Sequence, residues 1–212
     1  VVLSGEMDSL PDERFVKEFE KVVNDEGSDF GRFVEMLHML GVFQHVKFFK
    51  KTFTHRLLVN VRMMGEHVQA MKDAGLGSDT AAVLVAAFSA ATNDGGALRG
   101  FGSDVRDAFE ALKAFVAADT SHATANDVVN TLKKVRSTRG LSTHADRALT
   151  VMYALDRSHG WKMTFRSRAW RKFAEATASV DVEPLVARFS GKTLGEQIHK
   201  VMVQKVEEVM RG

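Results

Sequence analysis

The sequence contains no cysteine and only two prolines, Pro11 and Pro184, among its 212 residues. Without cysteine the chain can form no disulfide bond, no thiolate metal site and no cysteine nucleophile. Because proline interrupts helices, its scarcity suits a chain made mostly of helix. No apolar run approaches the roughly 20 residues that a membrane span needs, so we expect no membrane partner.

Strict alternation of apolar and polar residues, which is typical of half-buried strands, is also missing over any useful length. Apolar residues instead recur at helical spacing, as in Phe15, Phe19, Val22 and Val23. With 45% hydrophobic and 26% charged residues, the composition is that of an ordered globular chain. The sequence therefore predicts an all-α fold whose helices are joined by short turns.

Charge is distributed unevenly along the chain. Residues 1–35 hold ten acidic and four basic side chains, a net charge of −6. Residues 133–172 hold eleven Lys and Arg against two Asp, a net charge of +9, although the whole chain nets only +2. The molecule is thus electrically polar, and its basic half is compatible with an anionic partner.

Composition and turn signals divide the chain into three predicted parts. Residues 1–65 form an acidic, Phe-rich N-terminal helical part, either a cap or a docking surface for another protein, in which one long amphipathic helix runs from Phe43 to about Met64. Residues 66–192 form a helical-hairpin repeat region. Residues 193–212 form a C-terminal amphipathic helix, ahead of which Thr193 and Glu196 have capping-box spacing. The chain begins Val-Val-Leu without an initiator Met, so we expect a processed form or a fragment whose presequence is not visible.

Three stretches share the same local order of helix, turn and new helix. They are MKDAGLGSD before Thr80, AFVAADTSHATA before Asn126 and LDRSHGWKMT before Phe165. The first and third resemble the hairpin junctions of pentatricopeptide repeats. ADRALTVMYAL (145–155) is similar to that family's second helix, and VVNTLKK (128–134) is similar to its first helix. The resemblance covers roughly Met64 to Ala178.

This resemblance implies a right-handed array of antiparallel helical hairpins, an α-solenoid with irregular repeats. It also implies a non-catalytic RNA-binding subunit of an organellar, mitochondrial ribonucleoprotein, acting in RNA processing, editing, stability or ribosome assembly. In that family each repeat reads one RNA base with two or three side chains. The pairs that the resemblance assigns as readers are Leu84 with Asp79, Asn130 with Ala125, and Ala169 with Thr164. Among the three helix positions, only Asn130 can hydrogen-bond a base edge.

The basic stretch from Lys162 to Lys172 interleaves arginines with Phe165 and Trp170. Single-stranded RNA requires cations for its phosphates and flat side chains for stacking, so this composition suits RNA. The alternative interpretation is that the aromatic residues pack in the core and the arginines form a solvated face. The candidate RNA-binding residues are Asn130, Lys133, Lys134, Arg136, Arg139, Lys162, Arg166, Arg168, Arg171 and Lys172.

Signals of catalysis or metal binding are weak. The eight histidines never fall at His-x-x-x-His spacing, so we expect no metal. The glycine-rich GGALRGFG (95–102) follows no predicted strand and lacks Gly-Lys-Ser/Thr, so we expect a linker there. We therefore expect no enzyme and no cofactor. A protein-binding helical scaffold or adaptor without direct RNA contact is the second hypothesis, and an unrecognised all-α enzyme is the third.

Overall fold

The computed structural model describes residues 12–25, 27–45, 57–91, 98, 100–118, 122–158 and 164–212. Its helices are α1 (Asp12–Asn24), α2 (Phe30–Met39), α3 (Val42–His45), α5 (Leu57–Asp73), α6 (Thr80–Ala91), α7 (Ser103–Ala117), α8 (Ala125–Lys134), α9 (Thr143–Ser158), α10 (Thr164–Ala178), α11 (Glu183–Val186) and α12 (Gly191–Arg211). Across these residues the only β-type pairing is a single bridge between Thr138 and Gly140. The prediction of an all-α fold is confirmed. None of these helices combines the length and the hydropathy that crossing a membrane requires.

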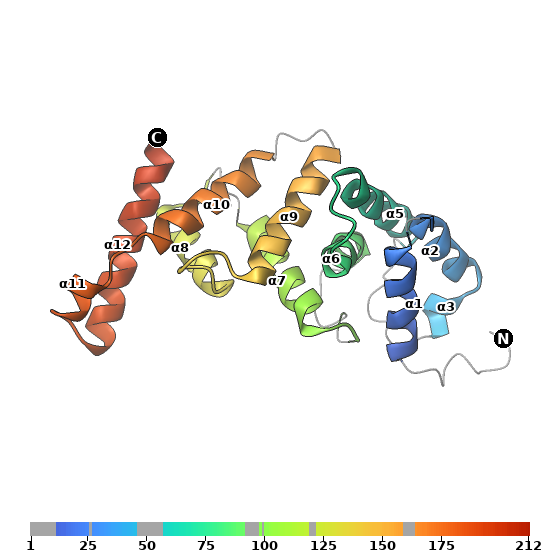
Figure 1. Ribbon diagram of the computed structural model, residues 1–212, viewed down its shortest axis with the longest axis horizontal. Coiled ribbons are helices and arrows are strands. Elements are labelled where there is room, and N and C mark those ends of the chain that lie inside the picture. The colour runs from blue at the N-terminus through green and yellow to red at the C-terminus, as the bar shows by residue number, and fades with distance from the viewer. Residues whose placement is uncertain are drawn as a thin grey trace.

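The helices follow one another along an elongated molecule (Figure 1). α1, α2 and α3 lie at one end, α6, α7 and α9 in the middle, and α12 at the other end. α5 packs against both α2 and α6, whereas α12 packs against α8 and α10. The acidic helices α1 and α2 therefore lie at one end, and the basic part of the sequence runs from the middle of the molecule toward α12.

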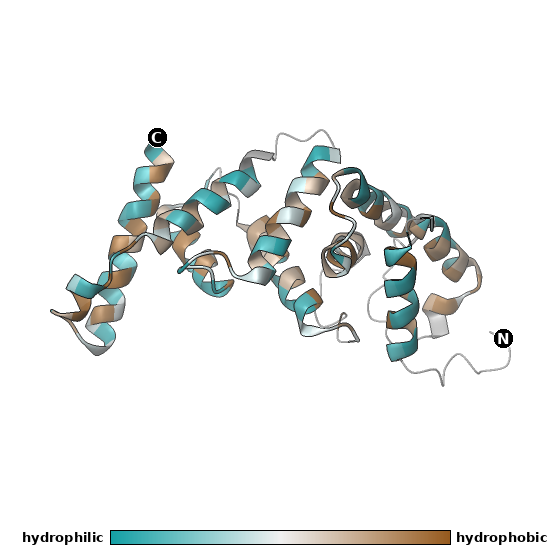
Figure 2. Ribbon diagram, viewed as in Figure 1, coloured by the Kyte–Doolittle hydropathy of each residue, from teal (hydrophilic) through white to brown (hydrophobic). Residues whose placement is uncertain are grey.

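Helix α6 lies at the centre because its sequence leaves it no polar face. Every residue from Ala81 to Phe88 is buried. A helix that is apolar all round must be covered on all sides, and α1, α5, α7 and α9 all pack against it. By contrast, α1 and α12 each carry a polar and an apolar face (Figure 2). On α1, the buried Phe19 contacts Phe88 of α6 at a ring-centroid distance of 5.8 Å.

Helix boundaries follow capping side chains that the sequence indicates. Asp29 accepts a hydrogen bond from the Arg32 amide at the start of α2, and Asp79 does the same for the Ala82 amide of α6. At α8, the Thr124 hydroxyl and the Asp127 carboxylate form a reciprocal capping box. The hydrogen bonds from Thr124 lower the pKa of Asp127. Asp29 and Asp79 thus both act as N-caps, as is typical of an aspartate just before a helix.

Several sequence expectations about individual elements are wrong. α5 continues through Gly65 to Asp73 instead of ending near Met64, while the start of that predicted helix lies outside the described residues. α12 begins at Gly191 after Ser190, so Thr193 is not its cap. Leu40 continues the helical spacing of apolar residues in α2, which predicts an inward side chain, but it is 55% exposed. On α12, Met202 and Val206 are buried, and Ile198 and Val209 are partly buried against the same core.

Candidate nucleic-acid interface

The turn that follows α8 holds its backbone in a defined, unusual conformation. The Arg136 amide donates to the Lys133 carbonyl at 3.0 Å, and the Ser137 amide donates to the Leu132 carbonyl at 2.8 Å. This pair of bonds is the Schellman motif, which places one residue in the left-handed region, usually a glycine. Here that residue is Arg136, with φ of 54°. An arginine therefore occupies a position where its backbone is less stable than that of glycine.

A polar cluster beneath the turn holds this conformation in place. The Val135 carbonyl lies within hydrogen-bond distance of three groups: Ser142 Oγ at 3.1 Å, His144 Nε2 at 3.1 Å and Ser137 Oγ at 3.2 Å. Ser137 is completely buried. The Val135 carbonyl and the Ser137 and Ser142 hydroxyls are thus hydrogen-bonded within the protein, so the turn forms an ordered platform.

Three cations project from this platform. Lys134, Arg136 and Arg139 are exposed, and within the described part of the chain none of them forms an ion pair. We call residues 134–140 the basic turn. On its α7 side, Lys134 and Arg136 line a small cavity of about 150 Å³ together with Asp107 and Glu110. Positive charge is therefore partly offset on that side of the basic turn.

The other two candidates on α8 are Asn130 and Lys133, and both are exposed. Lys133 Nζ lies 2.8 Å from Nδ1 of His199 on α12. His199 Nε2 lies 2.8 Å from Oδ1 of Asn126. Burial lowers the pKa of His199, and the neighbouring Lys133 charge lowers it further. Lys133 is thus engaged by α12 and differs in this respect from the cations of the basic turn.

The candidates on α10 point in different directions. Arg168 and Lys172 are exposed and one helical turn apart, so they share the outer face. Arg171 instead turns toward α9, where it pairs with Asp146 and donates to Thr150 Oγ1 at 3.3 Å. Arg166 is half-buried. Lys162 lies outside the described residues.

The aromatic side chains of this stretch belong to the core where their positions are described. Trp170 is completely buried and Phe173 is 6% exposed. The Trp170 ring packs on Phe115 of α7 at 4.9 Å and meets Phe173 edge-on at 5.9 Å. The stacking interpretation is therefore wrong for Trp170, and the alternative of core packing is confirmed for Trp170 and Phe173. The Phe165 side chain lies outside what the structure describes.

Burial also excludes one residue in each of two predicted base-reading pairs. Leu84 and Ala125 are buried, so neither can reach a base. Asn130 remains exposed on α8. Any reading of bases by this surface would depend on Asn130 rather than on a repeated code.

One arginine of the basic stretch 133–172 has a structural role that the sequence did not reveal. Arg147 of α9 is only 18% exposed, and its Nε lies 2.7 Å from Asp79 Oδ2. Its Nη1 lies 3.9 Å from Asp104 Oδ2 at the start of α7. His199 was likewise missed, because its partners Asn126 and Lys133 are 73 and 66 residues away in sequence. No local pattern carries either signal.

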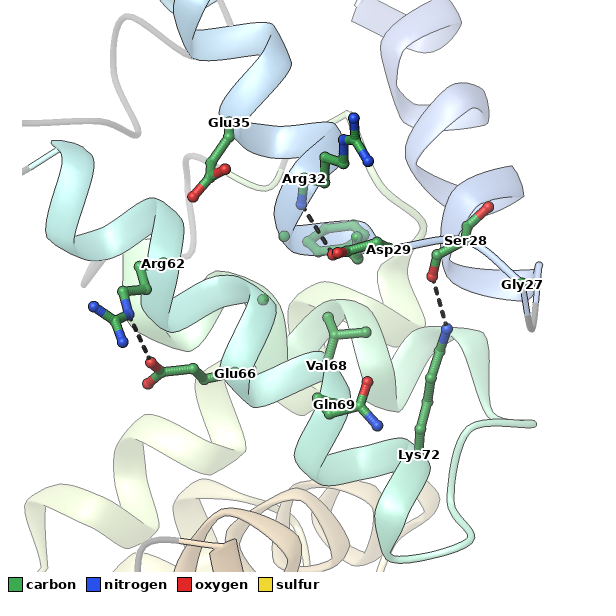
Figure 3. Close-up of a pocket in the computed structure, with 13 residues that line it drawn as sticks. Gly27, Ser28, Asp29, Arg32, Glu35, Arg62, Glu66, Val68, Gln69 and Lys72 are labelled. Atoms are coloured by element: carbon green, nitrogen blue, oxygen red, sulfur yellow. Dashed lines mark hydrogen bonds and ion pairs between the residues drawn. The ribbon is translucent and has the colours of Figure 1, made fainter.

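A second concave region lies at the acidic end of the molecule. A groove of about 650 Å³ runs between α2 and α5. Its walls carry charges of both signs: Figure 3 shows Arg62 paired with Glu66 at 3.1 Å, and Lys72 Nζ reaching the Ser28 carbonyl at 3.3 Å. None of the described residues that line the groove is a histidine. In the described part of the chain, no three His, Asp or Glu side chains gather as a metal site would require.

Comparison with protein-family models, with curated proteins and with solved structures finds no significant match to this chain. The resemblance to pentatricopeptide repeats therefore stays a prediction from local sequence.

Proposed function

We propose that the chain binds the phosphate backbone of single-stranded RNA through the basic turn, with Arg168 and Lys172 of α10 adding further contacts. In this proposal it is a non-catalytic subunit of a mitochondrial ribonucleoprotein that acts in RNA processing, editing, stability or ribosome assembly. Its helices would form an irregular right-handed α-solenoid of the pentatricopeptide type. The elongated succession of packed helices supports this last part (Figure 1).

The observation that carries the proposal is that Lys134, Arg136 and Arg139 extend from a hydrogen-bonded turn and have no ion pair within the described residues. Flexible surface lysines lose side-chain entropy on binding, and paired ones must first break their ion pairs. The three cations of the basic turn start from a backbone that is already ordered, and no ion pair holds them in the described part of the chain. Polyphosphate chains bind such sites by releasing condensed counterions.

Backbone contact is favoured over base reading because of where the aromatic residues lie. Trp170 and Phe173 are in the core and cannot stack on bases. Stacking platforms supply much of the affinity of proteins that hold unpaired bases. A surface built from cations and one exposed asparagine therefore suits phosphates, with little dependence on RNA sequence.

The test compares two triple variants that remove the same charge from opposite ends of the molecule. Lys134→Ala/Arg136→Gly/Arg139→Ala removes the basic turn, with glycine chosen because it accepts the positive φ at position 136. Arg14→Ala/Lys17→Ala/Lys21→Ala removes three exposed cations of α1. In fluorescence anisotropy with a 20-nucleotide single-stranded RNA, we expect the first variant to lose about tenfold or more in affinity. The α1 variant should bind nearly as the wild type does.

Equal losses in the two variants would mean that net charge alone drives binding, and the proposed site would be wrong. Far-ultraviolet circular dichroism of both variants checks that they keep their helices. If the basic-turn variant loses both RNA binding and helicity, the single Arg139→Ala variant replaces it in the assay, because that substitution leaves the α8 cap untouched.

A second candidate function is a protein-binding scaffold, favoured by the groove between α2 and α5. Its mixed charges suit a polypeptide partner better than a polyanion. Absence of RNA binding by the wild-type chain, at low salt and neutral pH, would favour this candidate.

A further inference from the structure

His199 connects α12 to α8 through side-chain contacts. It lies on α12, and both of its ring nitrogens contact α8 at 2.8 Å, one through Lys133 and one through Asn126. α12 also packs against α10, so this helix borders both elements that carry the proposed RNA-binding cations.

The chemistry of the partners fixes the protonation state of His199. A lysine ammonium can only donate, so Nδ1 of His199 must accept and cannot carry a proton. Nε2 then carries the ring proton and donates it to the Asn126 Oδ1. The contact as it stands requires a neutral imidazole between a cation and an amide.

Other charged groups near α12 do not replace Lys133 as the partner. On α12 itself, Glu196 pairs with Lys192 at 3.9 Å, and Lys200 is exposed. On α8, the Asp127 carboxylate is bound by Thr124. The remaining charged groups of the elements packed on α12 are Lys134 of α8, Arg166, Arg168, Arg171, Lys172 and Glu175 of α10, and Glu183 of α11. None of these forms a described hydrogen bond with His199, and Lys133 is the charge that lowers its pKa.

We propose that protonation of His199 turns this contact into a phosphate site, in which the imidazolium and the Lys133 ammonium together bind one phosphate of an RNA backbone. The proposal rests on the proposed RNA-binding function. Protonation removes the lone pair that accepts from Lys133 and places two cations side by side. A phosphate between them replaces repulsion with two charge-assisted hydrogen bonds. RNA affinity therefore rises as the pH falls.

The linkage works in both directions. Without RNA, burial and Lys133 hold the pKa of His199 below its ordinary value, so the ring is neutral at pH 7. A bound phosphate stabilises the imidazolium and raises this pKa. RNA binding thus takes up a proton at His199, and acid in turn favours RNA.

The test measures RNA affinity at pH 5.5 and pH 7.5 for the wild type, His199→Gln and His38→Gln. Glutamine at position 199 can still donate to Asn126 but does not titrate. His38 lies on α2 at the opposite end of the molecule and serves as the matched control (Figure 1). We expect the affinity gain on acidification to be about fivefold larger in the wild type and in His38→Gln than in His199→Gln.

Side-chain NMR of the full chain provides a readout that does not depend on affinity. The pKa of His199 should rise on adding the RNA, and in Lys133→Met it should start closer to its ordinary value. Inorganic phosphate at the same phosphate concentration should have a smaller effect; an equal effect would identify a small-anion site and overturn the link to RNA.

The two proposals fail in different ways. If the wild type binds no RNA at either pH, the proposed function is wrong and this inference falls with it. If the wild type binds RNA but His199→Gln keeps the full gain on acidification, this inference is wrong while the proposed function stands.

Discussion

At the scale of single residues, Gly31 and Gly65 lie where α2 and α5 approach each other closely. A Cβ atom built on Gly65 would lie 2.7 Å from the Gly31 Cα and 3.3 Å from its amide nitrogen. Both obstructing atoms belong to the backbone, so no side chain can turn away to make room. The glycine is needed here for space, although glycine inside a helix costs stability relative to alanine.

We expect Gly65→Ala to lower the free energy of unfolding by about 1–3 kcal/mol, because the two helices must move apart. Gly195→Ala is the matched control: it is also inside a helix, but its Cβ would meet nothing within 4 Å. That substitution should raise stability by up to about 1 kcal/mol through helix propensity alone. Urea unfolding of both variants measures the difference, and equal effects would contradict the close crossing.

At the scale of elements, Arg147 links α9 to the starts of α6 and α7. Its ion pair with Asp79 binds the carboxylate that also caps α6. The arginine is 18% exposed and the Asp79 side chain 43%, so solvent screens the pair only in part. Without the Arg147 cation, Asp79 would still cap α6 but would lose its ion-pair partner.

We expect Arg147→Met to cost about 1–2 kcal/mol in the free energy of unfolding, since methionine keeps the aliphatic stem but not the ion pairs. Arg168→Met on the exposed face of α10 should change stability by less than about 0.5 kcal/mol. In the RNA assay we expect the reverse order, because Arg168 belongs to the proposed site and Arg147 does not. A stability loss of the same size in both variants would show that Arg147 has no special structural role.

The elements differ in how far the sequence could predict them. α6 was predictable because a run of apolar residues follows a turn with two glycines and an aspartate cap. The predicted end of α5 near Met64 is wrong because of Gly65. A glycine required by close helix packing cannot be told in sequence from a glycine that ends a helix. Capping-box spacing at Thr193 misled the prediction of α12, since α12 already begins at Gly191.

At the scale of the whole molecule, the basic block of the sequence separates into cations with different surroundings. Arg147 and Arg171 are tied to aspartates, Lys133 is held by His199, and the basic turn remains open. The sequence could predict the concentration of charge but not this division, because each partner comes from a distant element. Likewise α7 packs more extensively on α9 than on its sequence neighbour α8, which no local pattern indicates. The predicted division at residues 65 and 192 and the mitochondrial setting stay predictions.

If the exposed cations of the basic turn and of α10 bind RNA phosphates, the affinity for RNA should depend steeply on salt concentration. Five cations engage the RNA in this account: Lys134, Arg136, Arg139, Arg168 and Lys172. Each phosphate contact on a single strand contributes about −0.7 to the slope of log K against log salt concentration, so the wild type should show a slope of roughly −3.5. Lys134→Ala/Arg136→Gly/Arg139→Ala should reduce it to about −1.4. A wild-type slope near zero, or an unchanged slope in this variant, would contradict the account.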